Sequence, residues 1–212
     1  YYVDNTNVLC TEVTGEDGSY RITDFAPRFE QYERYYKPLM LIRKVEPLSG
    51  HPQIRVTCEP TYDYGKQTFK KDRGSNHVQF HSADTHMRLA TNMPISHFFE
   101  NEMPFLLNQT VYLILTYGSA FEAPIERTAE EFQKRTQQYW QKWIKKASIP
   151  TFYQNEVIRS ALVLKLHQYE DTGAIIAAST TSLPEHPGSG RNWDYRYCWL
   201  RDSYYVLTAL SH

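Results

Sequence analysis

The sequence predicts a β + α multidomain chain, with an antiparallel β-sandwich over residues 1–122, a helical linker over 123–150, and the first helices of an all-helical domain over 151–212. Two observations carry this prediction. In the first part of the chain, short runs alternate apolar and polar residues and are broken by Gly and Pro, as in antiparallel sandwiches. Beyond residue 123, apolar residues recur at intervals of three and four, which is the period of an amphipathic helix.

The strands expected in the first domain are short and separated by turns. Residues 8–13 and 20–25 flank a turn that contains two glycines, Gly15 and Gly18. Further strands are expected at residues 39–45, 53–58, 77–80, 86–90 and 110–117. Short strands at this spacing indicate an antiparallel sandwich.

The linker is expected to be one amphipathic helix of about five turns. Thr128 and Glu131 match a capping box, with Thr128 as the N-cap, and Pro150 closes the helix. The apolar stripe consists of Phe132, Tyr139, Trp140, Trp143 and Ile144. Because two tryptophans at helical spacing are more often core residues than a surface that stacks on a ligand, we expect this pair to be buried.

Two more helices are expected in the last domain. The first covers about residues 154–169, and its buried stripe comprises Ile158, Ala161, Leu162, Leu166 and Tyr169. The second begins near residue 202, with Asp202 or Ser203 as its N-cap. Since a helix that has only just begun cannot bury its apolar face, we expect the last domain to continue beyond His212.

Charge and composition argue against several classes of partner. There are 23 Lys and Arg against 24 Asp and Glu, interspersed, so we expect no nucleic-acid partner. No apolar stretch approaches the roughly 20 residues of a membrane span, so we expect no membrane partner. Cys10, Cys58 and Cys198 form no CxxC, which predicts reduced, mostly buried thiols in a cytoplasmic protein. The sequence leaves open whether the protein is secreted, because residues before Tyr1 can be missing.

Three histidines, His77, His81 and His86, are the candidates for metal ligands. A pair of histidines four residues apart shares one face on a helix, whereas this stretch is predicted as strand and loop. No acidic third ligand is obvious either. We therefore expect no metal and no cofactor.

Residues 191–202 are the most unusual stretch of the chain, with four aromatic residues, three arginines and two aspartates. This composition suits a pocket for a neutral, polyhydroxylated ring, because aromatic faces cover C–H groups while Arg and Asp bond to hydroxyls. In an extended segment, odd positions share one face. The residues on that face would be Trp193, Tyr195, Tyr197 and Trp199.

Arg201 and Asp202 follow directly, at the expected start of the last helix. Arg201 offers a planar fork of donors, and Asp202 offers two acceptor oxygens at a helix N-terminus, where negative charge is favoured. Such a pair can hold two adjacent hydroxyls. The alternative is that Arg201 and Asp202 form ion pairs that tie helices together and that the aromatic residues are core, since such networks are common.

The segment 190–202 resembles the first active-site motif of glycoside hydrolase family 15, the family of glucoamylases, glucodextranases and bacterial-type trehalases. The shared pattern is Tyr-x-Tyr-x-Trp-x-Arg-Asp, met here at positions 195, 197, 199, 201 and 202. The resemblance implies that Arg201 and Asp202 bind hydroxyls of the terminal glucose. It also implies that the subsite walls are formed by Tyr195 and Trp199, with Trp193 and Tyr197.

The resemblance extends over most of the chain. Residues 14–28, residues 48–50 and the 60–65 loop look like the N-terminal β-sandwich of prokaryotic-type members, and the linker helix with Trp140-x-x-Trp143 also fits. In that family a sandwich, a helical linker and an (α/α)6 barrel follow one another. The resemblance thus implies that residues 151–212 are the truncated start of such a barrel.

The function implied is that of an inverting, exo-acting hydrolase that releases glucose from the non-reducing end of α-glucans or trehalose. Inversion needs a carboxylic acid and a carboxylate about 6.5–9.5 Å apart. In the family both are glutamates on later barrel segments, so we expect the catalytic residues beyond His212, and no activity from this chain alone.

The expected partners are an α-glucoside or oligosaccharide substrate and the remainder of the catalytic barrel. The sequence leaves open which α-glucoside is bound and whether the protein forms homo-oligomers. The alternative function is that of a non-catalytic carbohydrate-binding or structural β-sandwich module.

Overall fold

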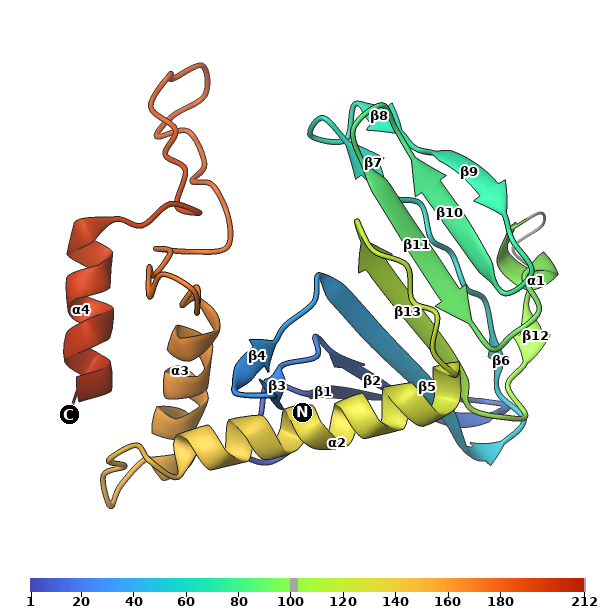
Figure 1. Cartoon of the computed structure of the whole chain (residues 1–212), viewed down its shortest axis with the longest axis horizontal. Helices are drawn as coiled ribbons and strands as arrows, with labels where there is room; N and C mark the ends of the chain where they lie inside the picture. The colour runs from blue at the N-terminus through green and yellow to red at the C-terminus, as the bar shows by residue number, and fades with distance from the viewer. Residues whose placement is uncertain (100–102, 212) are drawn as a thin grey trace. The chain divides into compact units, whose positions relative to one another are not determined.

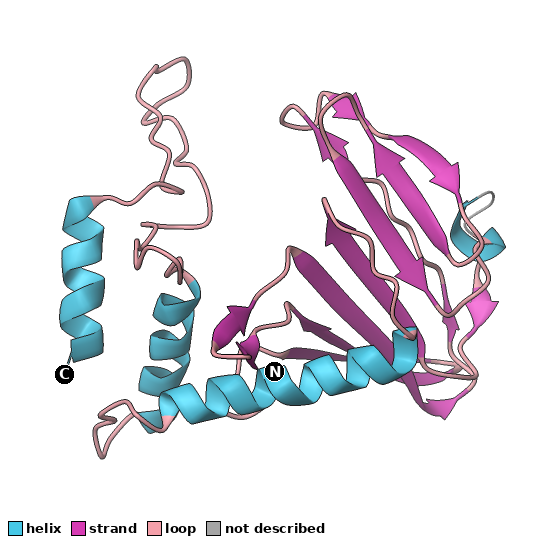
Figure 2. Ribbon diagram, viewed as in Figure 1, coloured by secondary structure: helices cyan, strands magenta, loops and turns pink. Residues whose placement is uncertain are grey.

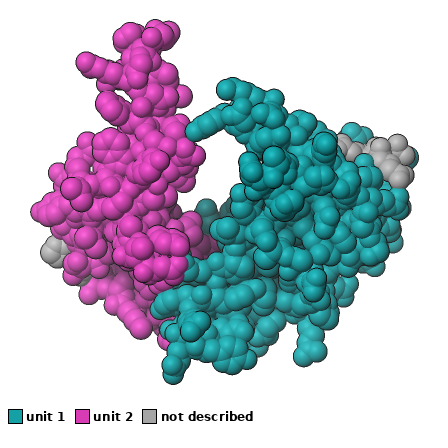
Figure 3. Space-filling view, turned by 45° about the horizontal axis from the view of Figure 1, so that its top comes forward, with its two compact units in different colours: residues 1–3, 8–139 teal, residues 4–7, 140–212 magenta. Residues whose placement is uncertain are grey.

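The structure is a computed structural model that describes residues 1–99 and 103–211 (Figure 1). Strands fill the chain up to residue 117, and the long helices follow (Figure 2). The chain divides into two compact units (Figure 3). Unit 1 comprises residues 1–3 and 8–139, and unit 2 comprises residues 4–7 and 140–212.

Unit 1 is built on a seven-stranded antiparallel sheet. In spatial order its strands are β1 (Leu9–Gly15), β2 (Gly18–Phe25), β5 (Met40–Gly50), β13 (Val111–Tyr117), β11 (His86–Thr91), β10 (His77–His81) and β9 (Lys70–Arg73). Three two-stranded ribbons accompany it: β12 (Phe105–Leu106) with β6 (Gln53–Ile54), β3 (Phe29–Gln31) with β4 (Arg34–Tyr36), and β7 (Thr61–Tyr62) with β8 (Gln67–Thr68). The predicted antiparallel β character of this region is confirmed.

The turn between β1 and β2 depends on one of its two glycines. Gly15 and Gly18 pair across the ladder, and Gly18 has a φ of 146°, which only glycine adopts readily. A Cβ at Gly18 would lie 2.2 Å from the carbonyl oxygen of Ser49 on β5. The absence of a side chain at Gly18 therefore lets β2 and β5 approach each other.

Each face of the sheet carries its own apolar cluster, because successive residues of a strand point to opposite sides. On one face, Val45, Leu89 and Leu113 pack with apolar residues of the segments that cover the sheet, namely Ile54, Phe69, Met93, Ile95 and Leu107. On the other face, Ile42 and Ile114 pack with residues of helix α2 (Ile125–Ile144) and its approach: Phe121, Ile125, Ala129 and Phe132.

Helix α2 begins earlier than predicted. Its first residue is Ile125, and the backbone N–H of Thr128 donates to the carbonyl oxygen of Pro124 at 3.1 Å. Thr128 is therefore inside the first turn, and the predicted capping box is wrong. The physical reason is Pro124, whose fixed φ and missing N–H suit the start of a helix.

Polar contacts attach α2 to the sheet inside unit 1. Glu130 of α2 accepts a hydrogen bond from the Tyr112 hydroxyl at 2.6 Å and pairs with Lys44 Nζ at 2.8 Å. Desolvation opposes the charge of Glu130, but the hydrogen bonds from Lys44 and Tyr112 outweigh it and lower its pKa. Burial, followed by the bond to Glu130, raises the pKa of Tyr112. The carboxylate thus stays ionised and the phenol stays neutral at neutral pH.

Unit 2 contains the end of α2 and the helices α3 (Gln154–Leu166) and α4 (Leu200–Ser211). Trp140 is 2% exposed, as predicted, whereas Trp143, also expected to be buried, is only partly buried. Among the described residues of this unit, the other buried apolar residues are Ile144, Ala161, Leu162 and Ile175. The segment 4–7 also belongs here. Arg159 of α3 donates to the Thr6 carbonyl at 2.7 Å and to Asn7 Oδ1, and Asn7 Nδ2 donates to the Leu162 carbonyl at 3.0 Å.

Helix α3 is shorter than predicted. It ends at Leu166, and the chain then turns back where Gly173, at a φ of 74°, donates its N–H to the Tyr169 carbonyl at 2.8 Å. Leu166 and Tyr169, expected in the buried stripe, are each more than half exposed. Lys165 is buried instead, because its ammonium bonds to Gln168 at 2.5 Å and to Glu170 at 3.2 Å.

Candidate functional site

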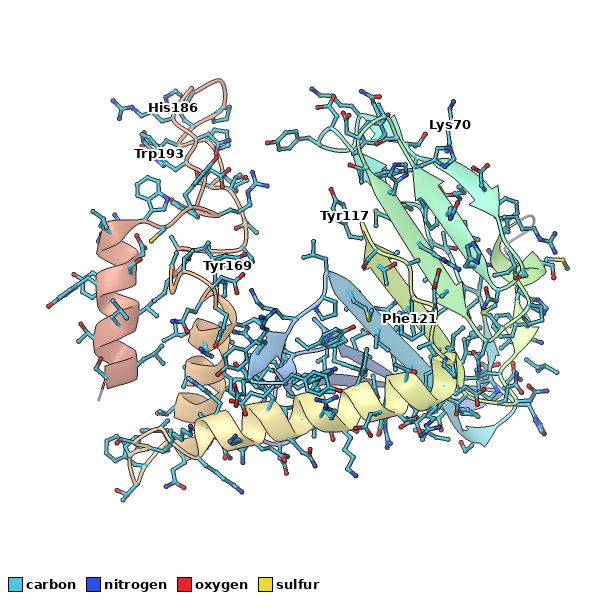
Figure 4. The ribbon with its side chains drawn as sticks, in the orientation of Figure 1. Lys70, Tyr117, Phe121, Tyr169, His186 and Trp193 are labelled. Carbon is cyan, nitrogen blue, oxygen red and sulfur yellow. The ribbon has the colours of Figure 1, made fainter. Side chains whose placement is uncertain are left out.

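The aromatic run lies in unit 2, on the loop that leads into α4, where Figure 4 shows Trp193. The extended conformation expected for it is wrong. Tyr195 and Arg196 form a turn, because Asp194 Oδ1 accepts a hydrogen bond from the backbone N–H of Arg196 at 2.9 Å. Asp commonly makes such a bond to the backbone two residues on, and so favours a turn over a strand.

The turn gathers two of the other three aromatic side chains around Trp199. Its ring meets Trp193 at a centroid distance of 6.3 Å and Tyr195 at 6.0 Å, both edge to face. Such pairs are favourable beyond the area that they bury. Tyr197 is 70% exposed. The structure therefore assembles Trp193, Tyr195 and Trp199 as one cluster, called here the ring cluster.

The backbone on either side of the ring cluster is held by a neighbouring segment of the same unit. The N–H groups of Ala178 and Ser182 donate to the carbonyls of Tyr195, at 2.9 Å, and Trp193, at 2.7 Å. The N–H of Ala177 reaches the Tyr197 carbonyl at 3.2 Å. The small-residue segment 177–182 thus runs beside the ring cluster and fixes its main chain.

Arg201 and Asp202 lie in the first turn of α4. The helix begins at Leu200, and the Ser203 N–H donates to the Trp199 carbonyl at 2.9 Å, so the prediction of Asp202 or Ser203 as N-cap is wrong. Arg201 Nη2 lies 3.1 Å from Asp202 Oδ2. The two side chains are 68% and 30% exposed. Their ion pair joins neighbouring residues of one helix and leaves both groups accessible to a ligand.

A second Arg–Asp pair within the run was not among the predicted site residues. The guanidinium of Arg196 grips the carboxylate of Asp194 with both arms, Nε to Oδ1 at 3.0 Å and Nη2 to Oδ2 at 2.7 Å. These hydrogen bonds from Arg196, side chain first and backbone second, lower the pKa of Asp194 to about 2. An Asp followed two residues later by Arg was the sequence signal that could have revealed it.

Cys198 departs from the expectation of mostly buried thiols. Cys10 is buried and Cys58 partly buried, but Cys198 is exposed beside the ring cluster. Its Sγ lies 3.3 Å from the Ser203 hydroxyl, and this hydrogen bond, followed by one from the backbone of Ile175, lowers its pKa. All three cysteines are free.

The three histidines are arranged as strand residues of β10 and β11. His77 Nδ1 lies 3.0 Å from Arg88 Nη2, and burial and the charge of Arg88 lower the pKa of His77. His81 Nδ1 lies 3.3 Å from Asp72 Oδ2, and His81 faces His86 across the ladder. Within residues 1–99 and 103–211, no group of three or more His, Cys, Asp or Glu is placed to hold a metal ion.

Among the residues that the structure covers, no helix combines the length and apolar character needed to cross a bilayer.

The structure thus places the ring cluster close in sequence to an accessible Arg–Asp pair in the first turn of α4. The family model of glycosyl hydrolases family 15 matches residues 151–212, which include both parts of this site. No solved structure gives a significant match to the chain.

Curated relatives agree with this family. The chain is 34% identical to a trehalase of Thermoplasma volcanium, over 100% of this chain and 34% of the relative. It is 34% identical to a trehalase of Mycolicibacterium smegmatis, over 81% of this chain and 27% of the relative, and 47% identical to trehalase 2 of Sulfolobus acidocaldarius over 34% of this chain and 12% of the relative. The chain thus spans about a third or less of these relatives.

Together these comparisons support a relationship to glycoside hydrolase family 15, of the trehalase type. The resemblance predicted from the motif at positions 195–202 is confirmed by the family-model match over residues 151–212.

Proposed function

We propose that the chain is the N-terminal part of an inverting, exo-acting α-glucoside hydrolase, and that its substrate is trehalose. The observation that carries this is the ring cluster beside Arg201 and Asp202, in the part of the chain that the family model matches. The relatives named trehalase favour trehalose over the longer α-glucans.

The site can hold one glucose unit by two kinds of contact. Tyr195 and Trp199, both partly buried, offer ring faces to the C–H side of the sugar. Arg201 donates to one hydroxyl and Asp202 accepts from its neighbour, so the 3.1 Å contact between them is exchanged for bonds to the ligand. These bonds lower the barrier to hydrolysis only as far as they tighten in the transition state. Asp202 therefore binds and orients the sugar.

The chemical step is assigned to the remainder of the protein. An inverting hydrolase needs a general acid and a general base about 6.5–9.5 Å apart, and we propose that both are carboxyl groups of segments beyond His212. We also propose that α3 and α4 are the first helices of an (α/α)6 barrel. In support, α4 buries none of its described residues here, and four of its apolar residues, Leu200, Tyr204, Tyr205 and Leu207, are more than half exposed.

A carbohydrate-binding role for the sheet is less well supported. A hollow of about 470 Å³ lies on one face of the unit 1 sheet. Its walls are mainly aliphatic, from residues such as Leu41, Val45, Leu113 and Leu115, with Tyr20 as the aromatic member. A sugar ring needs flat faces and convergent polar groups more than aliphatic walls. We therefore assign a supporting role to unit 1, and we propose that the protein acts in the cytoplasm, where its free thiols stay reduced.

The test compares the isolated 212-residue chain with the complete protein. The complete protein should release glucose from trehalose, and the isolated chain should not. In the complete protein, Trp199→Ala or Arg201→Ala should lower kcat/KM for trehalose by about 100-fold or more, because each removes a contact to the reacting glucose. Glucose release by the isolated chain, or full activity of both variants, would contradict the proposal.

A further inference from the structure

We propose that Asp194 is a positioning residue of the sugar subsite, which holds Trp199 and Tyr195 in place without touching the sugar. This inference rests on the proposed function. The residue lies outside the Tyr-x-Tyr-x-Trp-x-Arg-Asp pattern, and its role follows from the contacts of the turn at 194–197.

Asp194 makes three kinds of contact, two with Arg196 and one with Trp199. Its Oδ1 accepts from the backbone N–H of Arg196 at 2.9 Å and so closes the turn. Its carboxylate accepts two hydrogen bonds from the guanidinium of Arg196, at 3.0 and 2.7 Å, and the two groups thus form a planar, bidentate ion pair. This ion pair is called here the charged lock. The backbone carbonyl of Asp194 accepts from the indole N–H of Trp199 at 2.8 Å. One residue therefore holds both the turn and the tryptophan ring.

The consequence for the site follows from chain order. Tyr195 is the next residue in the turn, and its ring meets Trp199 edge to face at 6.0 Å. Trp199 immediately precedes α4, whose first turn carries Arg201 and Asp202. The bond from Trp199 to the Asp194 carbonyl thus links the aromatic wall to the start of the helix that presents the hydroxyl-binding pair. If the turn opens, we expect the rings of Tyr195 and Trp199 to shift relative to Arg201 and Asp202.

The carboxylate of Asp194 is engaged by Arg196 rather than by the site. Both of its oxygens accept from the Arg196 guanidinium. The same contacts keep the pKa of Asp194 at about 2, so the lock remains charged at any pH near neutrality. Asp194 is therefore suited to hold other groups in place and not to exchange protons with substrate.

The experiment uses the complete protein with Asp194→Asn, Asp194→Ala and the control Glu185→Gln. Asn keeps one oxygen for the turn but loses the charged lock, whereas Ala loses both. Glu185 pairs with Arg191 at 3.4 Å on the same loop, with side chains 48% and 73% exposed, so its variant removes a carboxylate without affecting the turn. Displacement of binding groups by about 1 Å can cost about 100-fold.

Two measurements separate positioning from mere stability. The first is the KM and kcat for trehalose, because a purely structural loss lowers the amount of active enzyme without changing KM. The second is the circular dichroism couplet that two close indoles produce, which reports the Trp193–Trp199 pair directly. We expect KM to rise about 10-fold in Asp194→Asn and further in Asp194→Ala. We expect the couplet to weaken in the same order, and both readouts to be unchanged in Glu185→Gln.

Each outcome decides one of the two proposals. Unchanged KM and couplet in Asp194→Asn and Asp194→Ala would overturn the positioning role while leaving the proposed function intact. A wild-type protein that does not hydrolyse trehalose would overturn the proposed function. The couplet would then decide alone, since its loss supports the positioning of the rings and its retention refutes it. Should Asp194→Ala fail to fold, Asp194→Asn decides by the same criteria.

Discussion

Removing one partner of the buried ion pair between Lys165 and Glu170 is expected to destabilise unit 2. Their side chains are only 10% and 12% exposed, and Nζ lies 3.2 Å from the nearer carboxylate oxygen. The pair joins the last turn of α3 to the segment that follows it. That segment leads to Ile175, whose carbonyl accepts from the Ser203 hydroxyl of α4 at 3.3 Å. We therefore choose Glu170→Gln as the perturbation.

The loss of stability expected for Glu170→Gln depends on which hydrogen-bond partners the Lys165 ammonium keeps. Removing one partner of a buried pair typically costs about 3–5 kcal/mol, because the other charge is left uncompensated. Here Gln168 Oε1 still accepts from Nζ at 2.5 Å, and the new amide offers one oxygen. We therefore expect a loss of about 2–3 kcal/mol. Lys165→Met combined with Glu170→Leu should cost less than Glu170→Gln alone, since it removes both charges.

The assay is urea unfolding of the 212-residue chain, followed by tryptophan fluorescence. All four tryptophans of the sequence belong to unit 2, so the signal reports this unit. Trp143 is also a local probe, because its ring lies 6.0 Å from Lys165 Nζ. Glu185→Gln, which removes an exposed pair, should change the unfolding free energy by less than about 1 kcal/mol. If Glu170→Gln behaves like this control, the reasoning from burial is refuted.

Two further predictions concern the sheet turn and the site. Gly18→Ala should destabilise unit 1 by about 2 kcal/mol or more, because its Cβ would lie 2.2 Å from the Ser49 carbonyl at a φ of 146°. Gly15→Ala is the control, with its nearest atom at 3.9 Å, and far-UV circular dichroism during thermal unfolding compares the two. The lowered pKa of Asp194 means that its contribution is complete above its ordinary pKa of 3.8 and is lost as the pH falls towards about 2. The indole couplet should therefore stay constant from neutral pH to about pH 4 and weaken below it; a couplet lost already near pH 5 would contradict this.

Local periodicity and one motif were sufficient to predict most strands, two of the long helices and the family resemblance. Alternating residues predicted the strands of the sheet because each strand buries one side chain in two. The three- and four-residue spacing predicted α2 and α3, and the residues from Tyr195 to Asp202 predicted the family. These features depend on neighbours along the chain, which is why they can be found without coordinates.

Helix ends and the conformation of the site depended on competing contacts. Pro124 started α2 ahead of the expected cap, and α4 began at Leu200, ahead of the predicted N-cap at Asp202 or Ser203, which placed Asp202 inside its first turn. The Asp194 carboxylate bound the backbone of Arg196 and replaced an extended strand by a turn. In each case a single local hydrogen bond or a proline was stronger than the average preference of the segment.

The remaining features were decided by contacts that depend on how the chain folds back on itself. Arg159 holds the segment 4–7 against α3 over more than 150 positions, so residues near the start of the chain belong to the helical unit. Lys165 appeared in sequence as one more charged helix residue and became buried only when Glu170 folded back over it. The sequence by itself determined the strand and helix patterns and the sugar-binding residue types. The tertiary structure determined which of those residues meet, because burial and pairing are properties of contacts that the local pattern does not encode.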